Sequence, residues 1–167
     1  PLIQGVDRRV FRWAPPRPRD GHFRIFSGGK FEWRKGHDLV IAAFRRLIET
    51  HPTAHLVCAW HNPWPGLFAT MANSPHIDTA ANGGTQEQFF ANLLLINGIP
   101  IHRFTILPQL THGQLAAEMT ATDCGLFPNR CEGGTNLVAM EYASIGRPIV
   151  ANALTGHADI RDAITHK

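Results

Sequence analysis

The fold is decided by the stretch Arg130-Cys131-Glu132-Gly133-Gly134-Thr135-Asn136-Leu137-Val138-Ala139-Met140-Glu141, which holds two acids, a glycine turn and a helix start within twelve residues. The short apolar run at residues 124–127, closed by a proline, is typical of a buried strand. The two glycines allow backbone angles that other residues avoid, and Thr135 or Asn136 is a good N-cap for the helix that follows. The stretch therefore predicts a strand, a glycine loop and a helix N-terminus in direct succession.

The predicted helix N-terminus suits an anionic oxygen such as that of a diphosphate. Unpaired backbone amides between Gly133 and Leu137 meet the positive end of the helix dipole there. Glu132 and Glu141 cannot attract phosphate, but they can accept hydrogen bonds from the hydroxyl groups of a sugar or a ribose. The alternative is an ordinary strand-loop-helix connection with Glu132 at the surface and Glu141 as a charge on the helix face.

A second candidate loop follows residues 22–27, which alternate like a strand and run into Gly28-Gly29-Lys30-Phe31-Glu32-Trp33-Arg34-Lys35-Gly36. Apolar residues then recur at helical spacing, so Lys30, Arg34 and Lys35 fall on a strand-to-helix crossover, where open α/β sheets bind ligands. Neither the phosphate-loop pattern nor the dinucleotide-binding pattern is present, and we reject nucleoside-triphosphate hydrolysis. A solvated basic turn remains the alternative for the three cations.

The whole chain alternates between strand and helix patterns. Strands are predicted near residues 22–27, 55–60, 103–107, 124–127 and 148–152, and helices near 38–50, 86–97, 113–121 and from residue 137. This alternation predicts an α/β fold with a doubly wound, Rossmann-like parallel sheet. Right-handed crossovers place the loops after the strands on one edge, which brings Lys30 and Lys35 toward the loop of Glu132.

Composition agrees with one globular domain. The chain has 167 residues, 44% of them hydrophobic, and no apolar run near the roughly 18 residues that span a membrane. Three cysteines are too few for a disulfide framework, and with no visible signal peptide a reducing cytoplasm fits best. Ten histidines invite a metal site, but Cys58 with His61 and Cys131 with His157 lack convincing ligand spacing, so no metal is expected.

The first residues and one internal segment stand apart from this pattern. Six arginines lie in the first 24 residues of a chain with net charge +3, which is compatible with nucleic acid, an anionic membrane surface or a solvated linker. Nearby prolines favour a linker over residues 1–20, followed by a domain over residues 21–167. Residues 62–85 are broken by prolines and glycines, and we expect Trp64 and Phe68 in this segment, with Trp60 just before it, to complete a core rather than cover a ligand.

Together the two loops resemble the C-terminal, donor-binding domain of retaining glycosyltransferases of GT-B fold, the glycosyl transferases group 1 family. Gly29-Lys30 and Lys35-Gly36 occupy the places of that family's Gly-Arg and Lys-Gly, with Lys30 in place of the usual arginine. Glu132 and Glu141 resemble the family's two glutamates, with eight residues between them instead of seven. Gly5-Val6-Asp7 and Arg147-Pro148-Ile149-Val150-Ala151 extend the resemblance over nearly the whole chain.

The resemblance implies roles for individual residues. Lys30, Lys35 and the amides of residues 133–137 would hold the donor diphosphate and stabilise its charge as the glycosidic bond breaks, without a metal. Glu132 would orient the sugar, Glu141 would accept from ribose hydroxyls, and neither would be a covalent nucleophile. His157 would lie near the donor cleft. Beyond the catalytic Lys30, Lys35 and Glu132, the expected donor contacts are Gly29, Arg34, Gly133, Gly134, Thr135, Asn136, Leu137, Glu141, Pro108, Gln109 and Leu110.

The resemblance also implies partners. The donor would be a nucleotide-diphosphate sugar, with UDP-sugar expected over GDP- or ADP-sugar, and no cofactor. A sugar or glycolipid acceptor would be bound by an N-terminal domain, and the enzyme would lie in the cytoplasm or at the cytoplasmic face of the membrane. The chain starts inside what resembles an interdomain connection and ends before the family's last elements, so we expect it to bind without transferring. A non-catalytic sugar-nucleotide module and, last, a basic nucleic-acid-binding domain are the alternatives.

Overall fold

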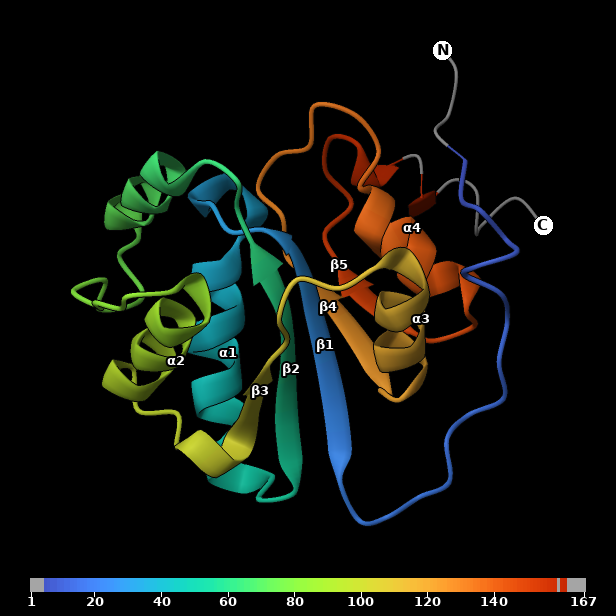
Figure 1. Ribbon diagram of the computed structural model, residues 1–167, viewed down its shortest axis with the longest axis horizontal. Coiled ribbons are helices and arrows are strands. Elements are labelled where there is room, and N and C mark those ends of the chain that lie inside the picture. Colours follow the sequence, from blue (N-terminus) through green and yellow to red (C-terminus); the bar gives the residue numbers. More distant parts are fainter. Residues whose placement is uncertain (1–4, 159, 162–167) are drawn as a thin grey trace.

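The protein, described by a computed structural model over residues 5–158, 160 and 161, is a parallel sheet between two layers of helices (Figure 1). The strands are β1 (Phe23–Lys30), β2 (Ala54–His61), β3 (Phe104–Ile106), β4 (Cys124–Phe127) and β5 (Ile149–Ala151). The helices are α1 (His37–Thr50), α2 (Gln86–Ile96), α3 (His112–Thr120) and α4 (Leu137–Ser144). Three 3-10 helices join them: η1 (Trp33–Lys35), η2 (Pro65–Asn73) and η3 (Ile101–Arg103).

The sheet has the doubly wound order β3-β2-β1-β4-β5 with every neighbouring pair parallel, which confirms the predicted fold class. The order reverses beside β1, because β2 and β3 extend the sheet on one side of it and β4 and β5 on the other. In Figure 1, α1 and α2 cover one face, and α3 and α4 cover the other. In such sheets ligands bind where the order reverses, at the carboxyl ends of the strands.

Alternating side chains of the central strands build a core on each face of the sheet. On β1, Ile25 packs into the core under α1 and α2, whereas Phe26 packs into the core under α3 and α4. Leu56 and Val57 divide in the same way on β2. This period of two explains why strands buried on both faces read as continuous apolar runs in the sequence.

Local capping fixes where the helices begin. The Thr85 and Thr111 hydroxyls accept from the backbone amides of Gln88 and Gln114, forming capping boxes at α2 and α3. The Asn136 side chain accepts from the Ala139 amide at 3.3 Å, so of the two caps that the sequence allows for α4, Asn136 is the one used.

Two local expectations need correction. First, β1 continues to Lys30, so Gly28-Gly29-Lys30 belongs to the strand and not to the loop that was predicted after residue 27. Second, the segment after β2 contains the 3-10 helix η2. Trp60 is buried and Phe68 packs against the same core, as expected, but Trp64 is 57% exposed and does not complete it.

Residues 5–20 pack along the face that α3 and α4 cover. Phe11 is buried in that core, and Ala14 donates its amide to the carbonyl of Ile145 at 3.1 Å. The Arg147 guanidinium donates to the carbonyls of Ala14 and Pro15. The segment expected to be a linker is therefore tied to the domain along much of its length.

In the described part of the chain, the helices are all too short or too polar to span a bilayer. The expectation that the domain stops short at Lys167 lies outside the described residues, as does Asp159 of the Thr155-Gly156-His157-Ala158-Asp159 motif.

Candidate functional site

A cleft of about 290 Å³ opens at the carboxyl ends of the strands, beside the point where the strand order reverses. Its walls come from the ends of β1 and β2, the segment between β3 and α3, and the first turns of α3 and α4. Six residues predicted to contact the donor line it: Gly29, Pro108, Gln109, Leu110, Leu137 and Glu141. The structure thus brings together positions that lie more than a hundred residues apart in the sequence.

Glu141 places a carboxylate in the wall of this cleft. The residue is 6% exposed, and burial raises the pKa of its carboxyl above the ordinary value, although the positive potential of His112 opposes this. No described residue donates a hydrogen bond to its carboxylate. Because Glu141 lines the cleft, its carboxylate stays open to the cleft space, where a ligand hydroxyl could donate to it.

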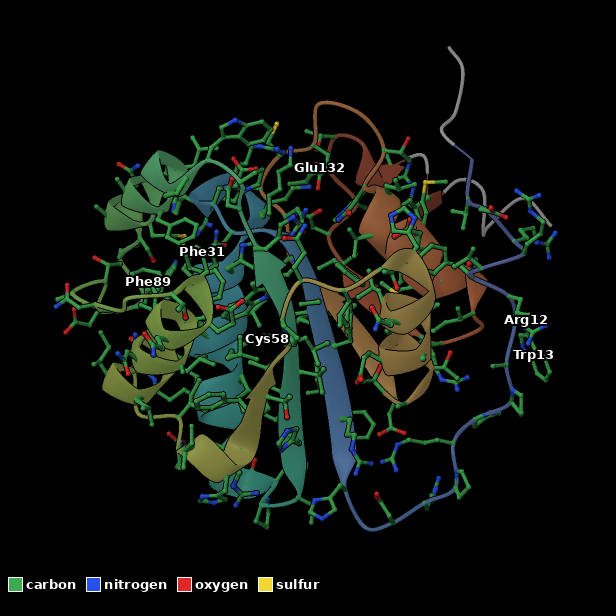
Figure 2. All side chains as sticks on the ribbon, in the orientation of Figure 1. Arg12, Trp13, Phe31, Cys58, Phe89 and Glu132 are labelled. Carbon is green, nitrogen blue, oxygen red and sulfur yellow. The ribbon has the colours of Figure 1, made fainter. Side chains whose placement is uncertain are left out.

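Glu132 lies at the same edge of the sheet, on the loop between β4 and α4 (Figure 2). Its carboxylate binds the Lys35 ammonium at 2.5 Å and the Arg34 guanidinium at 3.2 Å. Asn129 also donates its side-chain amide to it. The predicted meeting of Lys35 with the Glu132 loop is therefore observed, and charge-assisted bonds orient the carboxylate.

The segment from Gly133 to Leu137 connects Glu132 to the cleft wall. Neither glycine uses a left-handed backbone, contrary to the reason expected for their presence. Instead, a Cβ atom at either one would meet open space. Among the described residues, we find no acceptor for the backbone amides of residues 133–137, which lead into the first residue of α4.

A buried polar network holds the far side of this loop. The Asn136 side-chain amide contacts Nε2 of His157 at 2.9 Å, and Nδ1 of His157 contacts the Asn152 carboxamide oxygen at 2.9 Å. Burial lowers the pKa of His157. Thr155 accepts from the Glu132 amide at 2.9 Å. His157 thus contacts Asn136, which caps α4 and is itself one of the predicted donor contacts.

Lys30 lies elsewhere. Its ammonium sits 4.3 Å from the centre of the Trp64 ring, a cation–π contact at the start of the segment that carries η2. The structure therefore joins Lys35, but not Lys30, to the Glu132 loop.

Some residues at this edge were not predicted to belong to the donor site. Asn129 contacts Glu132, and Arg130 contacts Asp38 at 2.7 Å. His61 and His112 line the cleft. Only their positions after a strand or before a helix could have indicated them. Within the described residues, no group of three or more histidine, cysteine or acidic side chains could hold a metal ion.

Comparison with known proteins gives a consistent result. The sequence profile of the family described as "Glycosyl transferases group 1" matches residues 10–163. A glycogen synthase of Mycobacterium tuberculosis (strain CDC 1551 / Oshkosh) is 29% identical over 159 residues, which is 93% of this chain and 32% of that protein. The chain thus spans about a third of the length of this curated relative.

Solved structures show the same fold. The C-terminal domain of a glycosyl transferase group 1 family protein from Francisella tularensis gives a TM-score of 0.65 at 16% identity, covering 89% of this chain and 71% of that one. An Escherichia coli structure, described as trehalose-6-phosphate bound with UDP-2-fluoro glucose, gives 0.64 at 18% identity, covering 93% and 37%. At these identities the likeness concerns the fold.

Proposed function

The chain belongs to the glycosyl transferases group 1 family, and we propose that it forms the donor-binding domain of a retaining glycosyltransferase that uses a nucleotide-diphosphate sugar. The observation that carries this proposal is the cleft at the reversal of strand order, with the unpartnered carboxylate of Glu141 in its wall and the Lys35–Glu132 pair beside it. A sugar nucleotide carries hydroxyls, which can donate to the carboxylates at this edge. It also carries a diphosphate, which can accept from the cations and amides there.

In this proposal the diphosphate lies at the N-terminus of α4. The amides of residues 133–137 have no acceptor among the described residues, and the open space beside Gly133 and Gly134 would let an anion approach the backbone. Lys35 and Arg34, now paired with Glu132, add positive charge that the diphosphate would share. Charge that grows on the leaving diphosphate is then stabilised by fixed donors, without a metal.

The two glutamates take different roles. Glu141 would accept from the ribose hydroxyls, since its carboxylate lines the cleft and no described residue donates to it. Glu132 would orient sugar hydroxyls and favour positive charge at the anomeric carbon, and its contacts with Lys35 and Asn129 fix its direction. Neither acts as a covalent nucleophile. The base would lie near Pro108, Gln109 and Leu110, with uridine preferred.

Transfer is proposed to need an acceptor-binding domain, as in the family at large, so this chain alone would bind the donor without transferring. The acceptor would be a sugar or a glycolipid, and the enzyme would work in the cytoplasm or at the cytoplasmic face of a membrane. A non-catalytic sugar-nucleotide module is the second candidate, because Lys30 contacts Trp64 instead of the Glu132 loop. Assay of the natural protein for sugar transfer separates the two.

Calorimetric titration of the chain with UDP, GDP and ADP tests the proposed donor site. We expect saturable binding of one of them, and Lys35→Ala should weaken it about tenfold to a hundredfold, because a charge-assisted hydrogen bond contributes about 1.5 to 3 kcal/mol. Arg46→Ala is the control, since Arg46 is exposed on α1 and takes no part in the site. Unchanged affinity in Lys35→Ala would remove Lys35 from the diphosphate site.

A further inference from the structure

Arg130 joins the two loops that carry the proposed donor groups. It lies two residues before Glu132, and its guanidinium donates to both carboxylate oxygens of Asp38, at 2.7 and 2.8 Å. It also donates to the carbonyl of Trp33 at 2.8 Å and stacks on that indole at 4.5 Å. One side chain thus connects the loop after β4 to η1 and to the first turn of α1.

Asp38 is the buried end of this connection. Its side chain is fully buried, and it accepts a further hydrogen bond from Ser74, the C-cap of η2, at 2.6 Å. Burial pushes the pKa of Asp38 upward, but the hydrogen bonds from Arg130 and Ser74 together outweigh it and leave the pKa lowered. The carboxylate therefore stays ionised and holds Arg130 by a bidentate, charge-assisted pair.

Backbone hydrogen bonds join the same two loops. The amides of Arg130 and Cys131 both donate to the carbonyl of Arg34, at 2.8 and 3.3 Å. Arg34 and Lys35 are also the residues whose side chains reach Glu132. Since Glu132 and the cations come from loops about a hundred residues apart in sequence, something has to set their separation, and Arg130 with Asp38 lies directly behind them.

We propose that Arg130 and Asp38 are positioning residues, which hold the loop of Lys35 and the loop of Glu132 at the separation that a diphosphate sugar requires. The inference rests on the proposed function of the cleft. Neither residue touches the donor in this account. Ser74 extends the same connection to η2, so the segment after β2 is coupled to the donor site through Asp38.

A stability effect alone would not establish positioning, because Arg130→Met leaves a buried unpaired charge and must destabilise the fold. The double variant Arg130→Met/Asp38→Leu removes both charges, and such replacements often restore stability. We expect its thermal midpoint to recover toward that of the wild type, while its affinity for the nucleoside diphosphate that the wild type binds stays at least about tenfold weaker. Recovery of both stability and affinity would overturn the inference.

The chain offers a matched control. Arg17 and Asp123 form a similar pair at the opposite end of the sheet, with both Nε and Nη2 of Arg17 bound to Oδ2 of Asp123. Arg17→Met/Asp123→Leu should leave nucleotide affinity unchanged. If the Arg130 double variant does not fold, Arg130→Lys serves, because it keeps the charge but loses the planar fork. Arg130→Lys should bind about tenfold more weakly than Arg17→Lys, and equal affinity would contradict positioning.

Hydrogen exchange makes the test independent of the ligand. The amides of residues 130 and 131 should exchange faster in the Arg130→Met/Asp38→Leu variant than in the wild type, whereas those of Leu56 and Val57 in β2 should keep their protection. If the wild type binds none of UDP, GDP and ADP, the proposed function fails, and exchange still decides whether Arg130 and Asp38 hold the two loops together. Unchanged protection at residues 130 and 131 would then overturn the inference.

Discussion

Glu141 is a largely buried acid whose carboxylate faces the cleft and has no hydrogen-bond donor among the described residues. Its pKa is raised by that burial. Local choices that weaken a fold are found at functional sites, where a ligand supplies the missing partner. This is the physical reason for assigning ribose hydroxyls to Glu141.

Glu141→Gln should therefore stabilise the free protein and weaken its binding of nucleotide. A raised pKa means that the folded state holds the proton more tightly, so the penalty is full at neutral pH and disappears as pH falls below the pKa of the unfolded chain. We expect a higher thermal midpoint for Glu141→Gln at pH 7 and a smaller difference near pH 4.

The same variant should lower the affinity for the nucleoside diphosphate by about fivefold, because a neutral acceptor contributes roughly 1 kcal/mol less than a charged one. Affinity for inorganic pyrophosphate, which has no ribose, should not change. A loss that is equal for both ligands would assign Glu141 to the phosphate region instead.

The direction in which each side chain points could not be predicted from the sequence alone. Lys35 was predicted to meet the Glu132 loop from the shared edge of the sheet, and it does so. Lys30 was expected there too, but β1 includes it, and successive side chains of a strand point to opposite faces. Because Gly29 lines the cleft, Lys30 points away from it and reaches Trp64.

At the scale of elements, the loop between β4 and α4 depends on a close approach to the loop after β1. Gly36 has a left-handed backbone with φ of 72°, and a Cβ there would lie 2.2 Å from the carbonyl oxygen of Pro128. Any side chain at residue 36 would therefore force the two loops apart.

Substitution of two glycines separates this structural role from a ligand-facing one. Gly36→Ala should cost about 1 to 3 kcal/mol of unfolding free energy from backbone strain alone, measured by urea denaturation. Gly133→Ala should change stability by less than about 0.5 kcal/mol, since a Cβ there meets nothing within 4 Å. It should still weaken nucleotide binding, because the methyl group would occupy space beside the free amides. Wild-type affinity in Gly133→Ala would argue against a diphosphate there.

The elements themselves were largely predictable. Every strand and helix of the α/β alternation lies where the periodicity placed it, because amphipathic helices and buried strands carry strong patterns. The end of β1 was wrong, since its glycines were read as a loop. The 3-10 helix η2 was not predicted, because short helices with a proline at the start carry no period.

For the whole molecule, the N-terminal segment matters more than its composition suggests. Its prolines and arginines indicated a solvated linker, but burial depends on single apolar residues, and Phe11 is only 2% exposed. Arg12, next to it, points away from the domain (Figure 2). Charge counting could not reveal this, because the buried Phe11 lies among exposed arginines in the sequence.

Phe11→Ala should consequently destabilise the domain by about 3 to 5 kcal/mol, as expected for a buried aromatic side chain. Arg12→Ala should have little effect, because its side chain is exposed. Chemical denaturation of both variants provides the measurement. Equal stability of Phe11→Ala and the wild type would show that the segment is a linker outside the folded unit.

Nuclear magnetic resonance of the ¹⁵N-labelled chain can show whether a nucleotide binds in the cleft where the strand order reverses. On titration with UDP, we expect saturable shifts of the amides of Leu110, Val138 and Glu141. The amides of Phe23 and Asp123, at the opposite end of the sheet, should stay unchanged. Shifts confined to the opposite end, or no saturable shift with UDP, GDP or ADP, would contradict the account.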